Sequence, residues 1–301
     1  MTDEAASRAE RARARRVLVG VDGSADSLLA LRAGARAAAV LDAELVVVSV
    51  RHGVPGSAAD GRPGPLSDLE AGQRAAIGRA FGAAPPVLRA ELLDGVPGHA
   101  LMSAARDADL LVVGARGTGG FHGLPLGSAA LLCVLHAPCP VLVVRRGERL
   151  PVTEPVDAPG VRRIVVGVDG PGVHAQSAVR AALRAAAELD AGVVVVTAWH
   201  RPDGMPADDD AAASLEARAR TRQRAVLDGV LGRPLPASVR EVVREGSPAA
   251  VLLAESAGAD LLVVGSDARD TMTGALLGPV ALTVASHARI PVLVLRGTAI
   301  A

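Results

Sequence analysis

Aromatic residues are almost absent from this chain of 301 residues, which has no Tyr, two Phe and one Trp. Half of its residues are hydrophobic, so the cores must be packed from Val, Leu and Ala. The aromatic platforms on which single-stranded nucleic-acid binders stack bases are lacking. Basic and acidic side chains balance at 32 each, so no net charge would hold the chain on nucleic acid or an anionic membrane. We therefore expect neither as a partner.

Long apolar runs are also lacking. No stretch approaches the roughly 18 to 20 residues of a membrane helix, and the first residues lack the apolar core of a signal peptide, so we expect a cytoplasmic protein. Cys133 and Cys139 are too few for a disulfide framework and are expected to be small buried thiols, with a redox role as the alternative. The histidines His99, His136 and His287 have no partners at metal-ligand spacing, so the residues predict no metal site.

Three segments recur in the same order in the two halves of the chain. RRVLVGVDGS at 15–24 recurs as RRIVVGVDGP at 162–171, DADLLVVGARG at 107–117 as GADLLVVGSDA at 258–268, and APCPVLVVRRG at 137–147 as ARIPVLVLRGT at 288–298. Ordered matches at nearly one offset indicate duplication. We expect a disordered basic arm (1–14), an N-terminal domain (15–146), a Pro-rich linker (147–161) and a C-terminal domain (162–301).

Short apolar runs alternate with longer Ala/Leu/Arg segments of helical composition in each copy. Strands are predicted near 17–21, 45–50, 87–92, 110–113 and 141–144, and near 164–168, 193–197, 239–243, 261–264 and 292–295. Helices are predicted near 26–42, 68–82, 98–107 and 128–136, and near 175–190, 212–231, 248–257 and 279–287. Runs of Val and Leu are typical of parallel strands covered on both faces. The pattern predicts two tandem doubly wound α/β domains, each a five-stranded parallel sheet flanked by helices. We expect the strand order 3-2-1-4-5 in each.

Such sheets bind ligands beyond the carboxyl ends of their strands, where the strand order reverses. In the first copy these ends are Val21-Asp22-Gly23-Ser24 and the loop that starts at Gly114. Glycines permit positive φ or close approach of a ligand, and a helix that begins at Ser128 would attract a phosphate. The alternatives are a flexible glycine-rich surface loop and simple helix caps at Ser128 and Asp22.

The spacing G-x2-G-x9-G-S at Gly114, Gly117, Gly127 and Ser128, between DLLVVG and HAPCPVLVVR, resembles the universal stress protein family. The opening LVGVDGS resembles that family too, and the likeness covers nearly the whole chain in tandem form. The resemblance implies an ATP-binding protein, with Mg²⁺ or Mn²⁺ on the phosphates. It assigns nucleotide contacts to matching positions, namely Val21, Asp22, Val50, Val113, Gly114, Gly117, Gly127, Ser128 and Ala129.

The second copy departs from this motif. Gly265 and Gly278 remain, but Ala268 replaces the middle glycine, Pro279 replaces the hydroxyl residue, and Pro171 stands where the repeat places Ser24. Proline suits the first turn of a helix but removes an N–H and a hydroxyl from a phosphate site. We therefore expect ATP binding in the N-terminal copy alone.

The leading hypothesis is a regulatory module that senses adenine nucleotides in stress or dormancy, a role that comes from the resemblance. No catalytic residues are identified, because no general base or Walker-type Asp is placed near the motif. The alternatives are a slow metal-dependent ATPase and a nucleotide-free scaffold. We also expect an intramolecular pseudo-dimer through the last strands, 141–144 and 292–295, which would otherwise be exposed edges, and allow for a further homodimer.

Overall fold

The computed structural model describes residues 15–51, 66–81, 88–119, 124–146, 162–202, 209–266 and 277–296. The predicted arm (1–14) and linker (147–161) lie outside these residues, as does Ala268. Among the described residues, no helix combines the length and the apolar character needed to cross a membrane.

Strands and helices alternate along both halves, as the repeat predicts. The first half has β1 (Arg16–Gly20), α2 (Ala25–Leu41), β2 (Glu44–Arg51), α3 (Leu66–Phe81), β3 (Leu88–Asp94), α4 (Pro97–Ala104), the 3₁₀ turn η1 (Ala105–Asp107), β4 (Leu110–Gly114), α5 (Ser128–His136) and β5 (Val141–Val144). The second half has β6 (Arg162–Gly167), α6 (Val173–Leu189), β7 (Ala191–Trp199), α7 (Asp209–Leu231), β8 (Val239–Glu245), α8 (Pro248–Glu255), β9 (Leu261–Ser266), α9 (Pro279–His287) and β10 (Val292–Arg296). Every predicted strand and helix is present, with ends shifted by no more than three residues.

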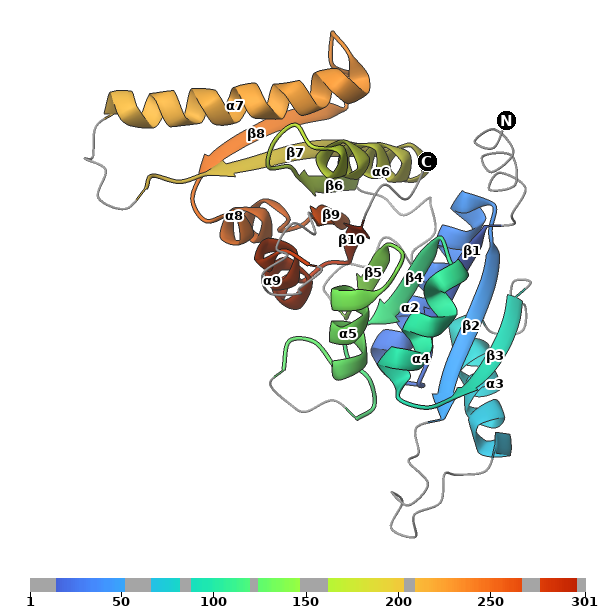
Figure 1. Cartoon of the computed structure of the whole chain (residues 1–301). Helices are drawn as coiled ribbons and strands as arrows, with labels where there is room; N and C mark the ends of the chain where they lie inside the picture. Colours follow the sequence, from blue (N-terminus) through green and yellow to red (C-terminus); the bar gives the residue numbers. More distant parts are fainter. Residues whose placement is uncertain are drawn as a thin grey trace, which may run out of the picture.

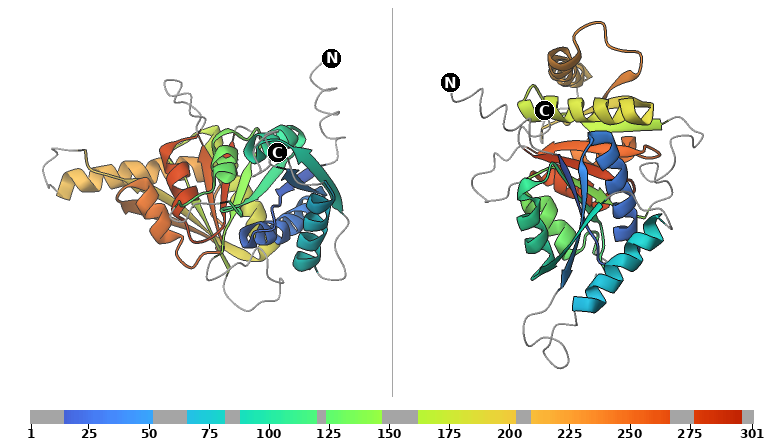
Figure 2. Two further views of the ribbon diagram at one scale, coloured as in Figure 1. Left: turned by 90° about the horizontal axis from the view of Figure 1, so that it is seen from below. Right: turned by 90° about the vertical axis from the view of Figure 1, so that its right-hand side faces the viewer.

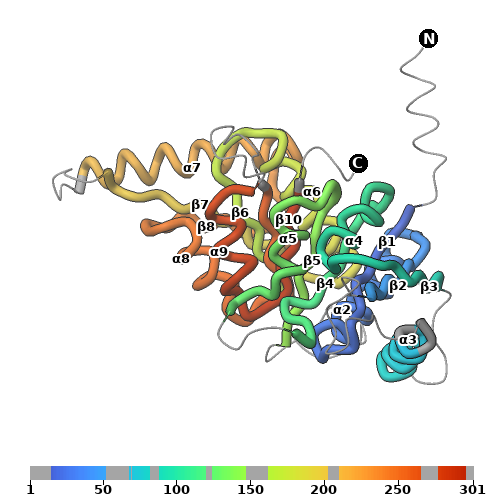
Figure 3. Tube along the Cα trace, turned by 60° about the horizontal axis from the view of Figure 1, so that its bottom comes forward, coloured from blue at the N-terminus to red at the C-terminus, as the bar shows by residue number. Residues whose placement is uncertain are grey.

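The strands form one sheet in the order β3-β2-β1-β4-β5-β10-β9-β6-β7-β8. Within each half the strands are parallel in the order 3-2-1-4-5, which confirms the predicted doubly wound fold. The two halves meet where β5 and β10 pair antiparallel, with Leu142 opposite Leu293 (Figures 1 and 3). Each of these apolar strands thereby covers an edge that would otherwise be open.

Two apolar layers pack on the two faces of the sheet, because successive side chains of a strand point to opposite faces. In β1, Leu18 belongs to one layer and Val17 and Val19 to the other. The first layer includes residues of α4, α5, α8 and α9, and the second includes residues of α2, α3, α6 and α7. The right-hand view of Figure 2 shows α2 and α3 on the opposite side of the strands from α4 and α5. Small aliphatic side chains thus build both layers with almost no aromatic residues.

Two buried glutamines, which sequence reasoning missed, fix the second helix of each half across the outer two strands of its sheet. The Nε2 of Gln73 in α3 donates to the carbonyls of Val47 and Glu91, each at 3.0 Å. The Nε2 of Gln223 in α7 donates in the same way to Val195 at 2.9 Å and Val242 at 3.0 Å. The repeat therefore preserves a polar bond that ties a helix to two strands.

Cys133 and Cys139 are both buried and carry free thiols, as expected from the sequence. Burial, and to a smaller extent the neighbouring Cys139, raises the pKa of the Cys133 thiol to about 12. At neutral pH the Cys133 thiol is protonated and behaves as an apolar core group.

Candidate functional site

The carboxyl ends of β1 and β4 are connected by side chains from the segment that joins β1 to α2 and from the first turn of α2. Asp22 Oδ2 accepts the backbone N–H of Thr118 at 2.7 Å, and Asp26 Oδ2 accepts that of Arg116 at 3.2 Å. Ser24 Oγ donates to the Arg116 carbonyl at 3.1 Å. Three short polar side chains therefore fix the start of the glycine loop that follows β4.

Asp22 is charged and engaged in this arrangement. Burial raises the pKa of its carboxyl group, but the nearby hydroxyls of Ser24 and Ser27 and hydrogen bonds from the backbone N–H groups of Thr118 and Ser24 outweigh burial and bring the pKa below its ordinary value. The side-chain cap of α2 is Ser24, whose Oγ accepts the N–H of Ser27 at 3.2 Å. Asp22 thus holds the loop, while the neighbouring serine caps the helix.

The first two motif glycines are required by protein packing. A Cβ at Gly114 would lie 2.7 Å from the backbone carbon of Asp26, and a Cβ at Gly117 would lie 2.5 Å from Asp22 Oδ2. Neither glycine has a left-handed φ, so close approach of protein atoms, and not positive φ, explains both. This reason for a glycine holds whether or not a ligand is bound.

Gly127 differs from these two glycines. Its φ of −70° and ψ of 157° suit any residue, and a Cβ there would make ordinary contacts of 3.5–3.6 Å with Ala115, Arg116 and Gly117. Such a Cβ would lie against the backbone at the start of the loop. Protein packing therefore does not demand glycine at 127, whereas a ligand lying against the loop would.

The first turn of α5 faces this loop. Its N-cap is Gly127, which supplies no side-chain cap, so the N–H groups of the first turn receive no such bond. The first N–H groups of a helix lack acceptors within the helix and favour an anion. Ser128 is exposed at the first helical position. Its N–H and hydroxyl are donors of the kind that bind a phosphate group, and the described residues fit such a ligand.

The four remaining predicted contacts are placed differently. Val21 and Val113 are buried at 5% and 3% exposure, and Val50 and Ala129 are half-buried. The N–H of Val21 donates to Val48 at 2.8 Å, and its carbonyl accepts the hydroxyl of Ser49 at 2.9 Å. The structure thus brings Asp22, Gly114, Gly117, Gly127 and Ser128 together around the loop, while Val21 and Val113 are buried in the two apolar layers on opposite faces of the sheet.

Among the described residues, no group of three or more His, Cys, Asp or Glu side chains is arranged to hold a metal ion. The oxygens of Asp22 and Asp26 accept backbone N–H groups of the loop. A divalent ion at this site would therefore depend on the phosphate oxygens of a nucleotide for its ligands.

The second half has a different site. The N-cap of α6 is Gly172, because the segment before α6 is one residue longer than the segment before α2. Gly172, and not Pro171, therefore takes the position of Ser24. Glycine has no hydroxyl, so it can form neither of the two hydrogen bonds that the Ser24 hydroxyl forms. His174 lies against Gly265 as Asp26 lies against Gly114, and it offers no carboxylate. The first residue of α9 is Pro279, which has no N–H.

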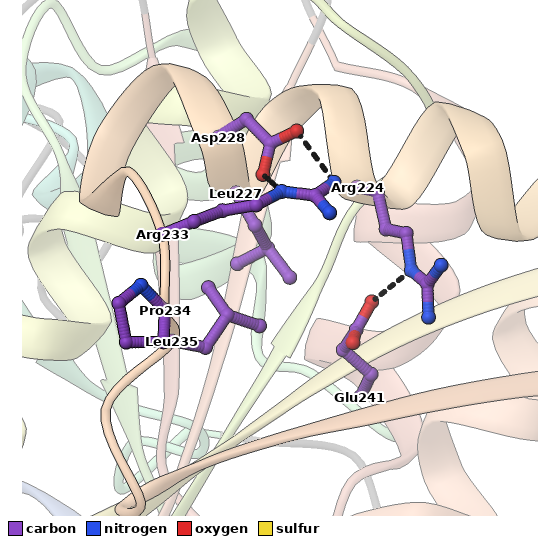
Figure 4. Close-up of a pocket in the computed structure, with 7 residues that line it drawn as sticks. All are labelled: Arg224, Leu227, Asp228, Arg233, Pro234, Leu235 and Glu241. Carbon is purple, nitrogen blue, oxygen red and sulfur yellow. Dashed lines mark hydrogen bonds and ion pairs between the residues drawn. The ribbon is translucent and has the colours of Figure 1, made fainter.

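A cavity of about 540 Å³ lies elsewhere, between α7 and β8 (Figure 4). Its charged side chains pair with one another: Arg233 with Asp228 at 2.8 Å, and Arg224 with Glu241 at 3.4 Å. Since these charges are already paired, we place the candidate site at the carboxyl ends of β1 and β4.

Comparison with known proteins agrees with the motif and the fold. The universal stress protein family model matches residues 13–145 and 160–296. Universal stress protein Rv2005c of Mycobacterium tuberculosis is 32% identical over 295 residues, which cover 93% of this chain and 96% of that protein. A crystal structure of a putative universal stress protein from Pseudomonas aeruginosa has the same fold, with a TM-score of 0.63, 20% identity and coverage of 95% of this chain and 94% of that one.

A universal stress protein solved in complex with cAMP is 30% identical over 44% of this chain and 97% of its own, with a TM-score of 0.35. The family model covers both halves of the duplicated sequence, and the 32% identical relative matches across both of them. The chain therefore belongs to the universal stress protein family, in its tandem two-domain form.

Proposed function

We propose that the N-terminal domain binds ATP at the loop between β4 and α5, and that the chain is a cytoplasmic regulatory protein that senses adenine nucleotides in stress or dormancy. The observation that supports this most is the start of the loop, which Asp22, Ser24 and Asp26 hold in place through hydrogen bonds to Arg116 and Thr118. A preformed loop loses little conformational freedom when a ligand binds, so more of the contact energy remains as affinity.

In this proposal the phosphates lie between the loop and α5. The Ser128 hydroxyl and the first N–H groups of α5 donate to phosphate oxygens, and the absence of a side chain at Gly127 leaves the space they occupy. Mg²⁺ or Mn²⁺ would be carried by the phosphates and would neutralise part of their charge. The base would lie toward the ends of β1 and β2, where Val50 is half-buried.

The C-terminal domain, in this proposal, does not bind ATP in the same way. Its cap lacks the hydroxyl of Ser24, His174 stands in place of Asp26, and Pro279 removes the first N–H of α9. We propose that this domain, over residues 162–301, acts as the fixed partner of residues 15–146 in an intramolecular dimer joined through β5 and β10. Formation of a further homodimer is part of the same proposal.

We also propose that the chain does not turn ATP over, because residues 115–119 and 124–127, the described part of the loop, include no side chain placed as a general base. The decisive experiment is to denature freshly purified protein, identify any nucleotide released, and titrate the emptied chain with ATP, AMP and cAMP in a calorimeter. One ATP per chain supports the proposal.

A phosphate-release assay, together with the same titration and a melting experiment, separates the two alternatives. Phosphate release that is fast, metal-dependent and abolished by Ser128→Ala would make the chain an ATPase. Failure of every nucleotide to bind or to raise the melting midpoint would make it a scaffold.

A further inference from the structure

Arg145, directly after β5, reaches from the N-terminal domain into the C-terminal domain. Its guanidinium donates to the carbonyls of Ala285 and Ser286 in the last turn of α9, the latter at 2.8 Å. The last carbonyls of a helix lack partners within the helix and carry its negative dipole end, so a cation there is stabilising. A residue of the N-terminal domain therefore caps a helix of the C-terminal domain.

Asp26 connects this cap to the candidate site. Its Oδ1 accepts the N–H of Arg146 at 3.3 Å, and its Oδ2 accepts the N–H of Arg116 in the loop at 3.2 Å. Burial lowers the pKa of Arg145, the negative charge of Asp26 opposes that shift, and the positive charge of Arg116 adds to it. The three charges thus act on one another at the junction between the loop, β5 and α9.

We propose that Asp26 and Arg145 couple the loop of the N-terminal domain to α9 of the C-terminal domain, so that an anionic nucleotide on the loop tightens the cap on α9. This inference rests on the proposed function. Nucleotide phosphates would offset the charge of exposed Arg116, relieve its repulsion of Arg145 and strengthen the bonds from Arg145 to Ala285 and Ser286. Helix α9 would then open less often, although no ligand touches it.

The test is hydrogen exchange of the full chain, followed by mass spectrometry of peptides that cover 279–290. With saturating ATP and Mg²⁺, we expect α9 amides to exchange at least about five-fold more slowly than without nucleotide. This factor is at the lower end of the range typical of coupling between two sites. Arg145→Met should remove this slowing while calorimetry still detects ATP binding. Arg146→Met is the matched control, because it changes the neighbouring exposed arginine and keeps the backbone N–H that Asp26 accepts.

The same exchange experiment without nucleotide tests the connection from Asp26 through Arg145 to α9 by itself. Asp26→Asn, a change in α2 of the N-terminal domain, should speed exchange in α9 of the C-terminal domain, and Arg145→Lys should give an intermediate rate. Bound ATP with unchanged α9 exchange would overturn the coupling and leave the proposed function standing. Equal α9 exchange in wild type, Asp26→Asn and Arg145→Met without nucleotide would overturn the connection as well. Absence of ATP binding in the calorimeter would reject the proposed function and this inference together.

Discussion

Replacing Ser128 by proline should abolish nucleotide binding without disturbing the fold. The N-caps of α5 and α9 have nearly the same backbone, with φ and ψ of −70° and 157° at Gly127 and −66° and 151° at Gly278. Proline follows Gly278 in the second domain, so the same helix start accepts proline there. Since proline is favourable at the first helical position and its predecessor is already extended, we expect the free energy of unfolding to change by less than about 0.5 kcal/mol.

The loss of affinity should be large. Ser128→Pro removes a hydroxyl and a backbone N–H from the phosphate site, and hydrogen bonds to charged groups contribute about 1.5–3 kcal/mol each. Losing both costs roughly 3–6 kcal/mol, which is on the order of 10²–10⁴ in Kd at about 1.4 kcal/mol per tenfold. Ser128→Ala removes the hydroxyl alone and should cost about 10- to 150-fold.

Titration calorimetry with ATP on wild type, Ser128→Ala and Ser128→Pro measures this series, and urea unfolding of the same proteins measures stability. We expect graded loss of affinity at constant urea midpoint. Unchanged ATP binding by Ser128→Pro, or two equal sites in wild type, would refute the assignment of the phosphate site to α5. A large drop in the midpoint of Ser128→Pro would refute the structural equivalence of the two helix starts.

Other predictions separate packing, charge and burial. Gly114→Ala should lower the free energy of unfolding by about 1–3 kcal/mol, because its Cβ would lie 2.7 Å from the backbone of Asp26. Gly127→Ala should keep the urea midpoint and weaken ATP binding. The reverse pattern would contradict the packing role of Gly114 and the ligand role of Gly127. The folded pKa of Asp22 is below its ordinary value, so the stability it contributes is present above about pH 4 and is lost as the pH falls further. Unfolding free energies measured between about pH 5 and pH 3 should therefore fall less steeply for Asp22→Asn than for wild type, and parallel slopes would count against this linkage. The thiols of Cys133 and Cys139 should resist a disulfide reagent at pH 8 in the native chain and react after unfolding, because both are buried and the pKa of Cys133 is raised to about 12. Fast reaction of either thiol in the native chain would contradict this burial.

The sequence by itself determined the duplicated architecture. Apolar runs of strand length, repeated in the same order, predicted all ten strands, because near-continuous Val and Leu marks parallel strands covered on both faces, and the expected order 3-2-1-4-5 is the one that the structure has. The same pattern located the crevice after β1 and β4, where Asp22 and the motif glycines stand. It also identified Pro279 as one of the departures from the motif in the second copy, since proline lacks a backbone N–H wherever it occurs.

Only the tertiary structure decided what holds the loop and why its glycines are needed. Thr118 bonds to Asp22 across 96 positions of sequence, and Arg145 bonds to Ser286 across 141. No local pattern reports such pairs, because sheet order and helix packing decide which atoms come within hydrogen-bonding distance. From the sequence motif, we expected the glycine at 117 to make room for a ligand. In the structure, the Asp22 carboxylate lies 2.5 Å from where a Cβ at position 117 would be, so protein packing requires the glycine. The extra residue at Gly172 and the tie from Gln223 to two strands likewise depend on three-dimensional contacts that spacing along the chain does not encode.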